Sequence, residues 1–482
     1  MNKLLAIITL IILNSTNLFP QWQPDVRLTN DGGYSFLSYN NARCLAASGN
    51  ILHVIWYDTR LGNWELFYKR STDTGVTWEA EVNLTNYDNL ISGFPSITVF
   101  DNNVYVVWDD SRDGNNEIYF KRSTDQGLTW GTDTRLTDNS EYSLNPSLAV
   151  SGSVLHVVWR DGRDGNAEIY YKRSTDGGIS WEVDTRLTDN PSTSANASVA
   201  VSDLLVSVVW EDSRQGSTEI YYKHSTDGGS NWSADTRLTN NSANSNNPSV
   251  AIAGSVVHVV WEDSPEVQPE IYYQRSTDGG TTWETETRLT NDQNVSEYPS
   301  LAVSGSVLYT VWSDRSSSSS SEVYYNRSID GGVNWESNTR LTDAPGLSDF
   351  PKIAISGSVV HTIWRDNREG NLEIYYKYNP SGNVTAVENL ELELPTEFML
   401  DQNYPNPFNP STRIQYQLSN TSQVSLNVYD VLGNEVATLV NEEKPAGSYE
   451  VSFNASQLSS GIYLYKLSAG NFIQTRKMIL VK

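Results

Sequence analysis

Short runs of alternating hydrophobic and polar residues recur along most of the chain, and turn-forming residues separate them. From Pro146 onwards, four such runs follow one another, at Ser147–Val150, Val154–Trp159, Glu168–Arg173 and Trp181–Leu187. The separators are Ser-Gly-Ser, Asp-Gly-Arg-Asp-Gly-Asn and Asp-Gly-Gly, which supply the positive φ angles that tight hairpins need. Runs this short, bounded by such turns, predict four antiparallel strands.

The same pattern recurs at a fixed period. A Trp-x-Asp tripeptide occurs seven times, 51 or 52 residues apart, at Trp56, Trp108, Trp159, Trp210, Trp261, Trp312 and Trp364. The first six copies are each followed by Ser-x-Asp-x-Gly-x-x-Trp, and an Arg-Leu-Thr segment recurs at the same period. Four strands per unit of about 50 residues predict the blade of a β-propeller.

The two ends of the repeat array complement each other. The seventh repeat has Trp364 and Glu373-Ile-Tyr-Tyr but lacks the Arg-Leu-Thr strand, whereas Val26-Arg27-Leu28-Thr29 precedes the first repeat. Pairing the two ends would remove the exposed sheet edges of an open array. We therefore expect a seven-bladed β-propeller over residues 22–378, closed by an N-terminal strand at residues 24–29.

The motif Ser-x-Asp-x-Gly-x-x-Trp, present six times between Ser71 and Trp335, resembles the Asp-box of bacterial neuraminidase repeat (BNR) proteins. The resemblance implies a propeller of the sialidase superfamily type. Asp-boxes occur in sialidases and also in many propellers that are not sialidases, so they indicate fold more than activity. In the family they lie in peripheral hairpins on the face away from the sialidase active site.

The aspartates of the boxes have a structural interpretation, because a carboxylate can accept backbone N–H groups inside the turn while the Trp packs on the blade. These structural residues are Asp73, Asp125, Asp176, Asp227, Asp278 and Asp330.

A second polar cluster, Asp-x-Arg-x-Gly followed by Glu, falls in the loop between the second and third strands, on the face where propellers usually bind ligands. Its arginines either brace the hairpin through ion pairs or form a ring that engages carboxylates or acidic sugars. The candidate ligand-binding residues are Arg60, Arg112, Arg163, Arg214 and Arg368. The fifth and sixth repeats depart from the pattern, at Asp263–Glu270 and in the serine run after Arg315.

No catalytic residue is assigned. His53, His156, His258 and His361 all stand three residues before the repeated Trp, which is typical of a packing position. The Arg-Ile-Pro segment of sialidases is not found, and near-identical repeats make each Arg, Tyr and Glu candidate ambiguous. Enzymatic activity is therefore left open, with binding favoured over hydrolysis.

The N-terminus has the order of a secretory signal peptide, with Lys3, an apolar run from Leu4 to Leu13 and a polar stretch, so residues 1–20 are expected to be removed. Residues 379–395 have the composition of a linker. Residues 396–482 contain alternating runs split by glycine turns, which predict a small immunoglobulin-like β-sandwich.

Several segments of this last module look like the type A sorting domain of the type IX secretion system, among them Gln402-Asn403-Tyr404-Pro405-Asn406-Pro407-Phe408, Val428-Tyr429-Asp430-Val431-Leu432-Gly433 and the terminal Lys477-Met478-Ile479-Leu480. The resemblance implies export through the periplasm and outer membrane by the type IX translocon. It further implies removal of the domain by the associated sortase, and either attachment to surface lipopolysaccharide or release.

The composition of the chain excludes several classes of partner and cofactor. A net charge of −25 disfavours nucleic acid, and Cys44, the single cysteine, excludes an intramolecular disulfide and a thiolate metal cluster. No cofactor or metal is expected, although calcium at the Asp-rich turns is left open, and we expect a monomer. The sequence thus predicts an all-β, secreted or cell-surface propeller that binds a glycan or protein ligand. The alternatives are a sialidase-like exo-glycoside hydrolase and a structural surface-layer component.

Overall fold

The computed structural model describes residues 22–40, 42–86, 90–264, 268–291, 294–317, 320–380, 398–403, 405–444, 447–470 and 472–481. All regular elements in these residues are β-strands, which confirms the all-β class. The expected signal peptide and nearly all of the expected linker lie outside the described residues. Contacts divide the chain into two units, Met1–Val384 and Thr385–Lys482. Within the described ranges, no helix is long and apolar enough to span a membrane.

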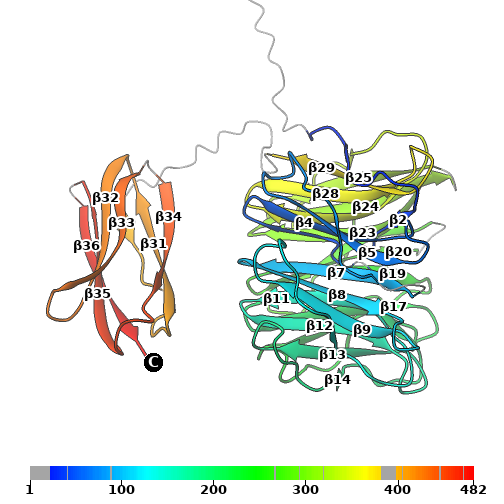
Figure 1. The fold of residues 1–482 in the computed structure, drawn as a ribbon, viewed down its shortest axis with the longest axis horizontal. Helices are drawn as coiled ribbons and strands as arrows, with labels where there is room; N and C mark the ends of the chain where they lie inside the picture. Colours follow the sequence, from blue (N-terminus) through cyan, green and yellow to red (C-terminus); the bar gives the residue numbers. More distant parts are fainter. Residues whose placement is uncertain are drawn as a thin grey trace, which may run out of the picture. The chain divides into compact units, whose positions relative to one another are not determined.

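The first unit is built from seven antiparallel sheets of one design (Figure 1). The first sheet contains β2 (Ser35–Phe36), β3 (Leu45–Ser48), β4 (Ile51–Asp58), β5 (Glu65–Ser71) and β6 (Val82–Asn83). The second contains β7 (Ser92–Phe100), β8 (Asn103–Asp110), β9 (Glu117–Ser123) and β10 (Thr134–Arg135). The third contains β11 (Ser143–Ser151), β12 (Val154–Asp161), β13 (Glu168–Ser174) and β14 (Thr185–Arg186).

The remaining four sheets repeat this order. The fourth contains β15 (Ser194–Ser202), β16 (Leu205–Asp212), β17 (Glu219–Ser225) and β18 (Thr236–Arg237). The fifth contains β19 (Ser245–Ala253), β20 (Val256–Asp263), β21 (Glu270–Ser276) and β22 (Thr287–Arg288). The sixth contains β23 (Val295–Ser304), β24 (Val307–Ser317), β25 (Ser320–Ser328) and β26 (Thr339–Arg340). The seventh contains β27 (Ser348–Ser356), β28 (Val359–Asp366) and β29 (Glu373–Asn379), together with β1 (Val26–Arg27) from the N-terminus.

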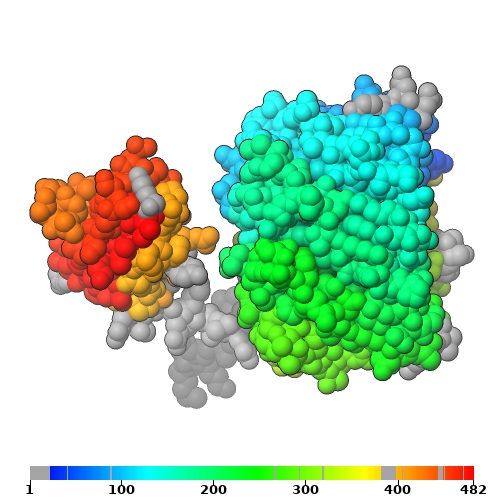
Figure 2. All heavy atoms as spheres, turned by 90° about the horizontal axis from the view of Figure 1, so that it is seen from below, coloured from blue at the N-terminus to red at the C-terminus, as the bar shows by residue number. Residues whose placement is uncertain are grey.

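The sheets are arranged as a propeller. Each innermost strand neighbours the innermost strand of the next sheet, and β27 neighbours both β23 and β3, so the series returns to its start. Successive sheets cover adjoining strips of the surface in chain order (Figure 2). β1 pairs antiparallel with β29, with Val26 opposite Tyr376 and Arg27 opposite Tyr375. The last sheet therefore contains strands from both ends of the array.

The repeated Trp-x-Asp tripeptide explains the core of each sheet. The seven tryptophans are fully buried. In the third sheet, the Trp159 indole N–H donates to the Asp161 carboxylate at 2.8 Å, and the Ser143 hydroxyl donates to the same carboxylate at 3.0 Å. A buried indole N–H needs an acceptor, so the aspartate two residues later both satisfies it and ties the second strand to the first.

The fourth strand is shorter than the hydrophobic pattern predicts. The run Trp181–Leu187 forms a strand only at Thr185–Arg186, because the residues before it are used by other contacts. Trp181 packs edge-on against Phe120 of the preceding sheet, and Asp184 forms an ion pair with Arg163. The outer edge of the sheet is thus closed by side chains rather than by a long strand.

The second unit is a β-sandwich. One sheet has the order β30 (Met399–Leu400), β31 (Ser411–Leu418) and β34 (Gly447–Asn454), and the other has the order β33 (Glu435–Lys444), β32 (Ser422–Tyr429), β35 (Gly461–Ala469) and β36 (Phe472–Leu480). Burial alternates along β31 and β32, as expected for sheets with one face in a core. The buried core includes Phe408, Tyr416, Tyr465 and Met478.

Candidate functional site

The five arginines predicted as ligand-binding residues are engaged inside their own sheets. Arg112 forms ion pairs with Asp110 and Asp133, both at 2.6 Å, and its guanidinium lies 4.1 Å from the centre of the Tyr119 ring. The same arrangement, an aspartate two residues earlier, a second carboxylate and an aromatic ring, surrounds Arg60, Arg163, Arg214 and Arg368. This geometry is that of a brace, and ligand binding by these arginines stays a prediction.

The six Asp-box aspartates organise the opposite turns. The Asp125 carboxylate accepts the Thr129 backbone N–H at 2.8 Å, the Thr129 hydroxyl at 2.5 Å and the Ser123 hydroxyl at 2.7 Å. These hydrogen bonds lower the pKa of Asp125 to about 2. Equivalent bonds to the side chain or backbone four residues later are made by Asp73, Asp176, Asp227, Asp278 and Asp330. The described residues contain no cluster of three or more metal-ligating side chains.

The four repeated histidines are core residues. His53, His156, His258 and His361 are buried, and the Nδ1 atom of each is 2.7–2.8 Å from a tyrosine hydroxyl on the neighbouring strand. Burial lowers the pKa of His156 to about 4. A neutral, enclosed imidazole of this kind is a packing element.

A different set of residues breaks the repeat on one face of the propeller. The residue after each repeated Trp is of five different types in the seven sheets, although its neighbours on both sides are constant. We call these seven residues the variable ring: Tyr57, Asp109, Arg160, Glu211, Glu262, Ser313 and Arg365. Each lies towards the end of the second strand of its sheet that adjoins the brace loop.

The variable ring is held by bulges in the innermost strands. In six sheets the register of the innermost strand shifts, and a non-glycine residue has a φ of 49–56°, at Phe94, Asn145, Asn196, Asn247, Tyr298 and Phe350. Four ring side chains accept the N–H of a bulge residue in the next sheet, at 2.7–3.2 Å, in the pairs Asp109–Asn145, Glu211–Asn247, Glu262–Tyr298 and Ser313–Phe350. Strained bulges are frequent beside functional sites, where they redirect side chains.

One sector of this face is acidic. Burial raises the pKa of Asp109 to about 7, and burial together with the charge of Glu262 raises the pKa of Glu297 to about 7. Burial also raises the pKa of Glu211 and Glu262. Arg315 partly offsets this acidity, since it forms an ion pair with Glu297 at 2.7 Å. Burial thus raises the pKa of four carboxyl groups on this face, which belong to the second, fourth, fifth and sixth sheets.

The other sector is aromatic. Tyr57 stacks on Phe36, with ring centres 5.2 Å apart, and contacts Trp64 and Phe94 at 5.1 and 5.4 Å. Tyr34, which is 51% exposed, lies beside Phe36 with ring centres 6.5 Å apart. Tyr57 itself is fully buried, so the aromatic surface on this face comes from Tyr34 and from the partly buried rings of Phe36, Trp64 and Phe94.

An arginine–carboxylate pair borders the aromatic sector. Arg365 donates two hydrogen bonds of 2.7 Å to the Asp349 carboxylate, and its guanidinium lies 4.4 Å from the centre of the Phe350 ring. Burial alone would lower the pKa of Arg365, but the hydrogen bonds and charge of Asp349 outweigh it and raise the pKa.

Our sequence-based reasoning did not single out the variable ring. The repeats drew attention to constant residues, whereas a site on a symmetric scaffold requires residues that differ between blades. The available signal was the middle residue of Trp-x-Asp, which changes in charge and size across the seven copies.

Two family matches cover much of the chain. Residues 9–208 match the BNR repeat-like domain, and residues 402–482 match the secretion system C-terminal sorting domain. No curated protein sequence matches the chain. The fold and repeat therefore define a BNR-type β-propeller.

More particularly, the chain is a BNR-repeat propeller with a secretion system C-terminal sorting domain. That domain makes it a cargo of the type IX secretion machinery, delivered to the outside or the surface of the cell.

Solved structures with a similar fold are distant in sequence. The polysaccharide lyase Uly1 is 10% identical, with 74% of this chain and 99% of that chain covered and a TM-score of 0.51. An ulvan lyase is 11% identical, with 73% and 95% covered and a TM-score of 0.49. The Trypanosoma rangeli sialidase bound to the inhibitor DANA is 11% identical, with 80% and 84% covered and a TM-score of 0.42. Identities this low bear on the fold alone.

Proposed function

We propose that the exported propeller is a glycan-binding protein whose ligand lies on the face of the variable ring. The observation that carries the proposal is the concentration of non-repeating side chains there. Seven sheets of one design share their core tryptophans, and five share the brace, yet five residue types occupy the seven positions after the tryptophans. Packing alone would favour one residue type at equivalent positions, so the diversity fits a single asymmetric ligand.

The chemistry of the face favours a saccharide. Ligand sites combine aromatic surface with a few placed polar groups. Here the aromatic cluster around Tyr57 occurs on the same face as the ring carboxylates and the Asn196 amide. The Asn196 amide donates to Glu211 at 2.9 Å, which orients that carboxylate. The acidic sector disfavours polyanionic glycans, so we expect uncharged sugar units. The similar fold of the polysaccharide lyase Uly1 supports this class of ligand.

A glycan array followed by calorimetric titration of the secreted chain tests this proposal. Tyr34→Ala removes a half-exposed ring and should weaken the affinity for an array hit at least tenfold with little effect on stability. Leu128→Ala, at a 62% exposed position in the Asp-box turn of the second repeat, is the matched control and should leave the affinity unchanged. Equal affinities for both variants, or a lack of any saturable hit, would exclude the proposal.

Glycan cleavage is a second candidate, favoured by one observation. A carboxylic acid with a pKa of about 7, such as Glu297, can donate a proton at neutral pH. The sialidase version requires three arginines on one substrate carboxylate, whereas Arg315 and Arg365 are each paired with a carboxylate of the protein. A fluorogenic sialoside assay and a polysaccharide depolymerisation assay separate the candidates. If the protein cleaves either substrate and Glu297→Gln abolishes that cleavage, the propeller is an enzyme rather than a binding protein.

We also propose that a sortase removes the C-terminal unit during export and links the propeller to surface lipopolysaccharide. The sorting domain supports this step. Intact mass of the mature protein from washed cells and from medium tests it. A mature chain that still contains Thr385–Lys482 would contradict removal, and an unmodified propeller found only in the medium would contradict attachment.

A further inference from the structure

The turn between β32 and β33 of the second unit exposes two large apolar side chains. Val431 is 68% exposed and Leu432 is 83% exposed. Two other connections in this unit carry small or polar residues instead, since Ser419-Asn420-Thr421 joins β31 to β32 and Gly470-Asn471 joins β35 to β36. Exposed apolar groups are in unfavourable contact with water, so this pair of residues needs an explanation other than folding.

The turn itself is held by a network of hydrogen bonds. The Asp430 carboxylate accepts the backbone N–H groups of Leu432 and Asn434 and the side-chain amide of Asn434, each at 2.9 Å. The Gly433 N–H donates to the Asp430 carbonyl at 3.1 Å, and Gly433 has a φ of +85°, which favours glycine. These contacts use the backbone and the side chains of Asp430 and Asn434. The turn therefore fixes Val431 and Leu432 on the surface without needing their side chains.

The apolar surface continues from the turn onto the neighbouring strand. β32 and β35 pair antiparallel, with Tyr429 opposite Leu464, so the end of β32 and the start of β35 lie at the same end of the sheet. On β35, Tyr463 is buried, whereas Ile462 and Leu464 on either side of it face outwards and are 46% and 36% exposed. These side chains form a cluster rather than scattered single residues. We call it the sheet-end patch: Val431, Leu432, Ile462 and Leu464.

The sheet-end patch lies within the sorting domain, and its turn belongs to a segment by which that domain is identified. Val428–Gly433 is such a segment, and it falls within the match over residues 402–482. Val428 is fully buried in the core, and Asp430 and Gly433 build the turn. Among the described residues of this unit, neither Val431 nor Leu432 belongs to the core or packs against it. The fold thus explains the rest of the segment but not these two residues.

The role of the domain indicates what covers the patch, because a sorting domain interacts with the secretion machinery. Residues 402–482 contain six basic and five acidic side chains, so the domain has little net charge with which to attract a partner. Rigidly held apolar side chains, in contrast, make good interface anchors. We propose that the sheet-end patch docks the sorting domain on a protein component of the type IX secretion machinery, with Val431 and Leu432 in an apolar pocket of that component.

Recognition by this surface requires a folded domain, because the turn and β35 meet only in the completed sheet. The inference is independent of glycan binding by the propeller, since all four residues of the patch belong to the second unit.

Export of the full chain from a bacterium that has the type IX machinery tests the proposal. Leu432→Ser should lower the amount of propeller on the surface and in the medium at least about tenfold, with the chain accumulating in the periplasm. Ile473→Ser is the matched control, because Ile473 is 63% exposed and lies opposite Ser468, at the other end of the same sheet. The proposal is overturned if Leu432→Ser is exported like the parent chain, or if both variants are impaired equally.

A second measurement identifies the partner and does not depend on the folding of Leu432→Ser. A photoreactive benzophenone side chain is placed at position 432 or at position 473 of the full chain, and cells are irradiated during export. Mass spectrometry of the adducts should find a protein of the secretion machinery linked to position 432 but not to position 473. Adducts of position 432 only with lipid, with the propeller or with a second copy of the chain would overturn the proposal, and so would the lack of any adduct.

Discussion

The Tyr376 hydroxyl of the seventh sheet donates a hydrogen bond of 3.1 Å to the Thr74 carbonyl in the Asp-box turn of the first sheet. The Tyr376 ring also packs edge-on against Trp78, with centres 5.0 Å apart. The same edge-on tyrosine–tryptophan contact joins successive sheets elsewhere in the array, as between Tyr171 and Trp232. The ends of the array are therefore joined by the contact used between neighbouring blades, and β1 is only one part of the closure.

The Asp-box glycines decide how closely neighbouring blades approach. A Cβ atom at Gly75, whose φ is +88°, would overlap the Tyr376 hydroxyl, whereas Gly152, with φ +60°, has open space around it. We expect Gly75→Ala to cost about 2–5 kcal/mol, from the left-handed backbone and from overpacking. Gly152→Ala should lower the free energy of unfolding only by the contribution of the left-handed backbone, about 1–2 kcal/mol. Urea unfolding of both variants measures the difference, and equal losses would refute the role of the contact.

The Asp-boxes should make the propeller sensitive to acid. Hydrogen bonds lower the pKa of Asp125, Asp176, Asp227 and Asp278 to about 2, below the ordinary value of 3.8. Because the folded pKa is depressed, the stabilisation is complete above about pH 4 and is lost as the pH falls towards 2. Carboxyl NMR titration should show these four midpoints near 2, and midpoints near 3.8 would contradict the hydrogen-bonded geometry.

The ionisation of Asp109 should destabilise the fold, in contrast to the ionisation of the Asp-box aspartates. Its carboxylate is fully buried, and burial raises its pKa to about 7. A raised folded pKa favours the protonated form, so this group costs stability as the pH rises from about 4 through 7. Asp109→Asn mimics the protonated acid and should gain stability relative to the parent chain at pH 8.5 but not at pH 5. Unfolding free energies at the two pH values test this, and a gain independent of pH would be inconsistent with it.

The Arg365–Asp349 pair should be far more sensitive to truncation than Arg160. Arg365→Leu leaves the mostly buried Asp349 carboxylate without its two hydrogen bonds, which should cost about 3–5 kcal/mol. Arg160 donates one long hydrogen bond of 3.5 Å to the Tyr142 hydroxyl, so Arg160→Leu should cost less than about 1.5 kcal/mol. Denaturant unfolding compares the two, and similar losses would show that Asp349 does not depend on its arginine.

Much of the architecture could be predicted because repeats encode local structure. The Trp-x-Asp period, the glycine turns and the Asp-box fix which residues form strands and hairpins, since these choices depend on neighbours within about 50 residues. The sequence likewise indicated the sandwich and the sorting domain. The brace arginines could be located from their motif, although the motif left open whether they brace the hairpin or bind a ligand.

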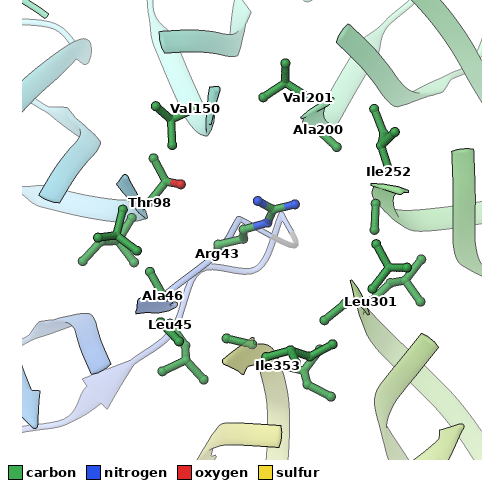
Figure 3. Close-up of a pocket in the computed structure, with 18 residues that line it drawn as sticks. Arg43, Leu45, Ala46, Thr98, Val150, Ala200, Val201, Ile252, Leu301 and Ile353 are labelled. Carbon is green, nitrogen blue, oxygen red and sulfur yellow. The ribbon is translucent and has the colours of Figure 1, made fainter. Parts of the chain in front are cut away.

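The candidate sites could not be predicted in the same way, because their members come together only when the ring closes. Glu211 meets the bulge at Asn247 in the next sheet, and Tyr39 meets Phe350 from the far end of the array. The axial cavity of the propeller is lined by Arg43 and by residues of all seven sheets (Figure 3). The sequence by itself determined the unit and its repetition. Tertiary structure decided which non-repeated side chains share one face or one cavity, because those contacts join residues that no local pattern links.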